Sequence, residues 1–179
     1  EYSMPTYQIL SSAQCISNMA RYDGIKYGYK PKNIDCLEEL CIQSRTEAFG
    51  VEVKKRIIFG NFILKNKDNN NSYYKSALNA KNYISKQFKE AFNKYDILLT
   101  PTTPTSATSF NDSNDTDIFL TISNLLGIPS ISIPCGFTEK NMPVGIQLIG
   151  NYLKDDIILN SAIQFQNNTD FHLKRPNII

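Results

Sequence analysis

Residues 124–136 read NLLGIPSISIPCG, and this stretch decides how the second half of the chain folds. Leu125 and Leu126 close an apolar, helix-like run, and Gly127 is the residue type that most often follows a helix end. The next run, 130–134, is strand-like, and a second strand-like run follows at 144–149. The stretch therefore predicts a helix that leads into two strands.

Three further segments extend this pattern in both directions. The apolar run 96–100, stopped by Pro101, predicts a buried strand. Residues 117–126 predict a helix with Asp115 or Thr116 as its N-cap, and residues 155–166 predict a last helix with one apolar face. The order strand, helix, strand, strand, helix indicates an α/β fold with helices covering a sheet.

The first half of the chain has a helical pattern. A first helix is expected before Gly24, and a capping box with Asp35 as N-cap predicts a second helix that ends near Gly50. Residues 53–64 predict a more buried helix, and residues 72–93 predict a long amphipathic one. Between them, the Asn-rich run 65–71 cannot bury apolar surface, so we expect an exposed loop there.

Composition excludes several classes of protein. The chain has 179 residues, 41% hydrophobic and 20% charged, with a formal net charge of +2. These values are typical of a globular domain and give no electrostatic reason to expect nucleic-acid binding. No apolar run is long enough to span a membrane. Because the chain begins at Glu1, we expect it to be a piece of a longer protein.

The residues alone do not predict a catalytic or metal site. The four cysteines lack metal-ligand spacing, and we expect packed, reduced thiols. Cys135 could pair with His172, the only histidine, although a packed thiol and a surface histidine explain both residues more simply. Asp112, Asp115 and Asp117 lack the glycine and the distal glutamate of a calcium loop, so capping and solvation explain them better.

Three isolated residues would matter only in a site that other residues help to build. Arg56 lies on an apolar helix, where it must reach solvent, pair with an acid or bind a ligand carboxylate. Asp117 fits a helix start equally well, and Tyr7 fits an aromatic side chain at a rim. These alternatives stay open on the residues alone.

Longer motifs are more specific than single residues. The chain resembles the amidase-signature family in YDILLTPTTP (95–104), in residues 124–136 and in MPVGIQLIG (142–150). Within that family, SNMARYDGIKYGY (17–29) and RTEAFGVEVKKRII (45–58) resemble the A subunits of glutamyl-tRNA(Gln) amidotransferases. The resemblance covers nearly the whole chain except the Asn-rich run and residues 106–114.

The resemblance implies a mixed β-sheet flanked by helices, with residues 1–179 forming the C-terminal portion of a single domain. In this family the A subunit hydrolyses glutamine with a Ser–cis-Ser–Lys triad. The ammonia passes to the B subunit, which uses ATP and Mg²⁺ to convert Glu-tRNA(Gln) to Gln-tRNA(Gln), and a C subunit is possible. The family's Gly/Ser-rich catalytic segment has no counterpart here, so we name no catalytic residue and expect this piece alone to be inactive.

By position in the motifs, the resemblance assigns Arg56 to the α-carboxylate of glutamine, Asp117 to its α-amino group and Tyr7 to the lining of the same pocket. A zwitterionic amino acid requires one cationic and one anionic partner, so the assignment is chemically consistent. Gln14 stands where the family commonly has glutamate, so we transfer no charged role to it. The resemblance implies neither a metal nor a cofactor on this chain.

Two other functions remain as alternatives. One is a non-tRNA amidase of the same family that acts on an aryl or fatty amide, against which the pair of Arg56 and Asp117 argues. The other is a non-catalytic assembly module that docks a partner subunit. The Lys-, Asn- and Ile-rich composition suits an organellar protein, from a plastid-like organelle such as an apicoplast or from a mitochondrion, and also the cytoplasm of a reduced bacterium.

Overall fold

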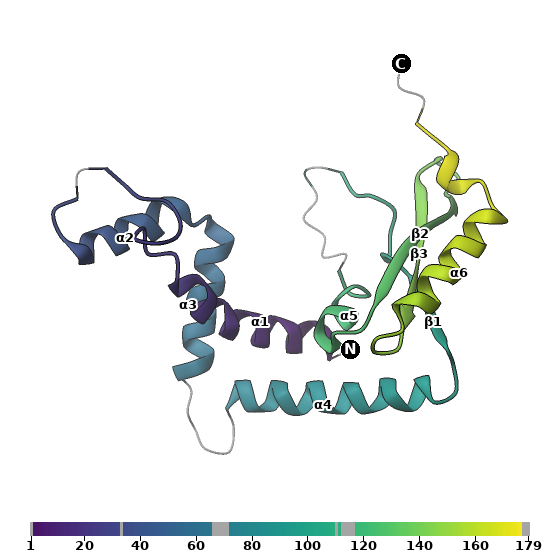
Figure 1. Ribbon diagram of the computed structural model, residues 1–179, viewed down its shortest axis with the longest axis horizontal. Helices are drawn as coiled ribbons and strands as arrows, with labels where there is room; N and C mark the ends of the chain where they lie inside the picture. The colour runs from purple at the N-terminus through teal and green to yellow at the C-terminus, as the bar shows by residue number, and fades with distance from the viewer. Residues whose placement is uncertain (1, 33, 66–71, 110, 112–116, 177–179) are drawn as a thin grey trace. The chain divides into compact units, whose positions relative to one another are not determined.

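The computed structural model describes residues 2–32, 34–65, 72–109, 111 and 117–176. They fall into two compact units: an N-terminal unit of Tyr2 and Met4–Ala80, and a C-terminal unit of Ser3 and the residues from Lys81 onward (Figure 1). The expectation of a single domain over 1–179 stays a prediction. The predicted loop 66–71 and the predicted N-caps Asp115 and Thr116 lie outside the described residues.

The N-terminal unit is helical, as the sequence predicts. It contains nearly all of α1 (Ser3–Ala20), then α2 (Leu37–Ala48), α3 (Val51–Lys65) and the start of α4 (Tyr73–Phe92). The α2 boundary differs from the prediction by one residue, because Cys36 and not Asp35 is the N-cap. Its sulfur accepts a hydrogen bond from the backbone N–H of Glu39 at 3.5 Å, which satisfies one free amide of the first turn.

Helix α3 is much less buried than expected. Only Gly60 and Ile63 are buried, whereas Ile58 is 70% exposed and Phe62 is 57% exposed. The prediction of a buried helix was wrong because the apolar residues of α3 surround the helix instead of forming one stripe. Only the stripe through Gly60 and Ile63 is covered in the described part of the chain.

Helices α1 and α3 make a very close contact (Figure 1). A Cβ atom added at Gly60 would collide with the backbone carbonyl group of Ser12 and would lie 3.0 Å from the Cδ1 atom of Ile16. Glycine is therefore required at this position by the approach of two backbones, and its φ angle is not positive. This contact sets which residues of the two helices face each other.

The C-terminal unit contains an antiparallel three-stranded sheet in the order β1-β3-β2. Its strands are β1 (Ile97–Pro101), β2 (Ser130–Phe137) and β3 (Pro143–Gly150). Helix α6 (Asp155–Asn167) lies along β2 and β3, and α5 (Thr121–Leu126) precedes β2 (Figure 1). A 3-10 turn, η1 (Phe171–Leu173), contacts β2. The predicted α/β class and the order of these elements are confirmed.

The core of the C-terminal unit joins the sheet to α6. Ile133 of β2, Leu148 of β3 and Ala162 of α6 are buried together, with Phe165 packed against them. Strand β1 is less buried than predicted, since among the described residues it pairs only with β3 and Leu99 is 63% exposed. An apolar run predicts a strand but does not say whether that strand lies at an edge.

The start of α5 also differs from the prediction. Residues 117–120 form a turn, and the helix begins at Thr121. Gly127 ends it in the left-handed conformation, with φ 67° and ψ 40°, as the sequence predicts.

We expect Gly60→Ala to destabilise the protein. Alanine would gain about 1 kcal/mol of helix propensity, but a methyl group pressed against a backbone carbonyl costs about 1–3 kcal/mol because the backbone cannot move aside as a side chain does. Urea denaturation of the full-length protein should therefore show a net loss of unfolding free energy. Gly50→Ala is the matched control, because a Cβ there meets no atom within 4 Å. Equal effects of the two substitutions would contradict the close contact.

Candidate functional site

Tyr7 and Arg56 line the same cavity of the N-terminal unit. The cavity has a volume of about 310 Å³, and its other walls are Gln8, Ser11, Ser12, Glu52, Lys55 and Phe59. The close contact of α1 and α3 explains why Tyr7 and Arg56 line the same cavity. Arg56 lies one turn before Gly60 on α3, and Gln8 lies one turn before Ser12 on α1, so residues near the contact face each other. The structure thus brings together two of the three predicted site residues.

The Arg56 guanidinium is available in this cavity. Its side chain is exposed and makes no hydrogen bond or ion pair with any residue that the structure describes. Phe59, 43% exposed, gives the cavity an apolar wall on the same helix. A guanidinium beside an apolar surface can bind a carboxylate through two parallel N–H donors.

Glu52 and Lys55 place a second pair of charges on the cavity wall. The Lys55 ammonium lies 2.8 Å from the Glu52 carboxylate. This hydrogen bond and the positive charge of Lys55 hold the pKa of Glu52 below its ordinary value of 4.5, and Arg56 contributes a smaller effect in the same direction. Glu52 is therefore ionised at neutral pH.

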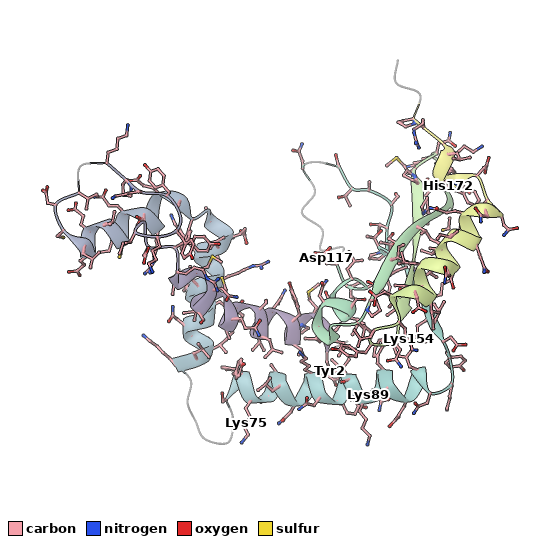
Figure 2. All side chains as sticks on the ribbon, viewed as in Figure 1. Tyr2, Lys75, Lys89, Asp117, Lys154 and His172 are labelled. Carbon is pink, nitrogen blue, oxygen red and sulfur yellow. The ribbon has the colours of Figure 1, made fainter. Side chains whose placement is uncertain are left out.

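Asp117 belongs to the C-terminal unit and lies in the turn that leads into α5 (Figure 2). Its backbone carbonyl accepts hydrogen bonds from the N–H groups of Leu120 and Thr121 and from the Thr121 hydroxyl, the last at 2.8 Å. These bonds fix the turn on which the exposed Asp117 side chain is carried. Its assignment to the α-amino group of glutamine stays a prediction.

The structure does not form the catalytic dyad considered from the sequence. The Cys135 thiol donates to the backbone carbonyl of Val144 at 3.5 Å. The Nδ1 atom of His172 is buried and has no hydrogen-bond partner among the described residues. All four cysteines are free, as expected. The expectation that all of them are packed was wrong for Cys36, which is exposed because its sulfur caps the start of α2.

The described residues offer neither a metal cluster nor a membrane-spanning helix. In that part of the chain, no group of three or more histidine, cysteine or acidic side chains could hold a metal ion. None of its helices combines the length and the apolar character needed to cross a bilayer. Asp112 and Asp115 lie outside the described residues, and Gln14 is exposed on α1.

Glu52 and Lys55 line the cavity but were not predicted from the sequence. The signal was present in VEVKKR (51–56), where an acid is followed three and four residues later by cations. Such spacing usually marks a solvated helix face, and only the nearby wall of α1 shows that these charges border a cavity.

The fold matches that of solved amidase structures. The structure of 6-aminohexanoate cyclic dimer hydrolase matches with a TM-score of 0.70, covering 99% of this chain and 37% of that one at 16% identity, which shows the fold alone. The crystal structure of the A subunit of glutamyl-tRNA(Gln) amidotransferase from Thermotoga maritima matches with a TM-score of 0.52 at 25% identity, covering 92% of this chain and 39% of that one. The family model described as Amidase matches residues 1–159, and the chain belongs to this family.

Two relatives confirm the resemblance to A subunits. The glutamyl-tRNA(Gln) amidotransferase A subunit of Ruthia magnifica subsp. Calyptogena magnifica is 42% identical over 98% of this chain. The glutamyl-tRNA(Gln) amidotransferase A subunit of Listeria welshimeri is 40% identical over 99% of it. The chain spans 37% and 38% of the lengths of these two relatives.

We expect Lys55→Ala to raise the pKa of Glu52 toward its ordinary value. The substitution removes the hydrogen bond and the charge that lower this pKa, and NMR titration of the Glu52 carboxyl group measures the change. Because the folded-state pKa is lowered, the pair stabilises the protein above the ordinary pKa, and this stabilisation is lost as pH falls through the lowered value. An unchanged pKa in the variant would show that the pair does not persist in solution.

Proposed function

We propose that this chain is part of the glutamine-hydrolysing A subunit of a glutamyl-tRNA(Gln) amidotransferase and contributes residues that bind glutamine. The observation that carries the proposal is 42% identity over 98% of the chain to a relative with that name. The cavity that contains both Tyr7 and Arg56 supports it independently.

The proposed reaction is hydrolysis of glutamine to glutamate and ammonia, which then amidates Glu-tRNA(Gln) at a partner subunit that uses ATP and Mg²⁺. The catalytic serines and lysine would come from outside the 179 residues, so this chain would serve substrate recognition. The proposed partners are the B subunit of the amidotransferase and a possible C subunit. We propose a plastid-like organelle or a mitochondrion as the compartment, with bacterial cytoplasm as the alternative.

Recognition by charge explains how such a site would select its substrate. Arg56 would bind the α-carboxylate through two N–H donors, Tyr7 would line the pocket, and Asp117 would bind the α-amino group. A simple aryl or fatty amide has neither charge, so it would leave both charged groups without a ligand partner and bind poorly.

We expect Arg56→Ala, made in the full-length subunit within its complex, to raise the KM for glutamine by one to several orders of magnitude. This corresponds to about 2–5 kcal/mol, the usual cost of removing one partner of a charge pair that is buried once the ligand is bound. Steady-state glutaminase kinetics measure it. Arg21→Ala is a suitable control, because among the described residues the Arg21 side chain bonds only to Asn18, in the last turn of α1. A KM within threefold of wild type would contradict the role of Arg56.

We expect Asp117→Asn to impair glutamine-dependent amidation much more than ammonia-dependent amidation, because free ammonia bypasses the glutamine pocket. Measuring both rates on one preparation separates binding from assembly. Equal losses in the two assays would contradict the assignment. A wild-type complex that assembles with the B subunit but hydrolyses no glutamine would instead favour the non-catalytic assembly module.

A further inference from the structure

Three charged residues of α3 line the cavity between α1 and α3: one acid, Glu52, and two cations, Lys55 and Arg56. Either cation could form an ion pair with Glu52. Glu52 precedes Lys55 by three residues and Arg56 by four on α3. Its carboxylate pairs with Lys55 at 2.8 Å, while Arg56 pairs with no acid in the described part of the chain. Among the described residues, no other acid lines the cavity.

The partner of Glu52 matters because its carboxylate could instead form an ion pair with Arg56. A glutamate four residues before a cation is the favoured arrangement for an ion pair on a helix. A guanidinium binds any carboxylate in the same two-donor geometry. Glu52 would thus present to Arg56 the same chemical group as an amino-acid ligand, from a fixed position on the same helix.

We propose that Lys55 is a positioning residue that holds the Glu52 carboxylate away from Arg56 and so keeps the guanidinium available for the carboxylate of the ligand. This inference rests on the proposed function, because it assumes that Arg56 binds the α-carboxylate of glutamine. Lys55 acts through Glu52 and makes no contact with the ligand.

The size of the effect follows from the exposure of the pair. The Lys55 and Glu52 side chains are 67% and 77% exposed, and water screens exposed ion pairs strongly. Competition by Glu52 should therefore weaken glutamine binding by about two- to fivefold. Loss of Arg56 itself should have a far larger effect.

The test is steady-state glutaminase kinetics on the full-length subunit in its complex. We expect Lys55→Ala to raise the KM for glutamine two- to fivefold with kcat unchanged, because the freed Glu52 then pairs with Arg56. The double variant Glu52→Gln/Lys55→Ala should restore a wild-type KM, since the competitor is gone. Lys55→Arg should keep the wild-type KM because it preserves the cation. High salt should reduce the defect of Lys55→Ala.

Lys54→Ala is the matched control. It removes the same charge one residue earlier, from a side chain that bonds to the backbone carbonyl of Thr46 at 2.7 Å and does not line the cavity. Its KM should stay within twofold of wild type.

Two results would overturn the inference. If the raised KM persists in the double variant, Lys55 attracts the ligand directly; if Lys55→Ala leaves KM unchanged, Glu52 does not compete. Arg56→Ala separates both results from failure of the proposed function. A large effect of Arg56→Ala keeps that function whatever Lys55 does, whereas no effect removes the function and the inference together.

Discussion

The close contact of α1 and α3 is the constraint on which the candidate site depends. Gly60 allows the two helices to approach until the backbone of one meets the carbonyl of Ser12 on the other. One turn before the contact, the helices leave a cavity bordered by Tyr7 and Arg56. Tyr7 and Arg56, 49 positions apart in the sequence, therefore line one cavity because Gly60 has no side chain and lets the two helices approach closely.

The same contact explains why the site is built on exposed helix surface. Helix α3 buries only Gly60 and Ile63, so the residues one and two turns earlier are free to carry charge. In the proposed role of Lys55, Arg56 keeps its N–H donors available because the nearby acid, Glu52, already pairs with Lys55 at 2.8 Å. Whether the Arg56 guanidinium is available thus depends on all three charged residues of this helix segment, Glu52, Lys55 and Arg56.

The elements predicted most accurately from the sequence are those with strong local signals. The strand-like runs around Ile131 and Ile146 and the helix end at Gly127 predicted the C-terminal unit closely, because these signals depend on neighbours in the chain. Prediction failed where the answer depended on distant residues. Within the described residues, the exposure of Ile58 and the edge position of β1 could not be predicted, since both depend on which surfaces the other elements cover. Arg56 and Tyr7 were identified by resemblance, and only the helix contact shows that they share a cavity.

A solved structure with this fold indicates where specificity must lie. A cyclic amide hydrolase matches 99% of the chain at only 16% identity, so the backbone arrangement tolerates very different side chains and does not itself select a substrate. Selection must come from a few groups placed on that backbone. We propose that in this chain the cavity wall of α3 supplies such groups, because it combines a cation with no partner in the described residues and an acid paired with a second cation. A neutral amide gains nothing from such a wall, whereas a ligand with a free carboxylate gains a charge-assisted pair of hydrogen bonds.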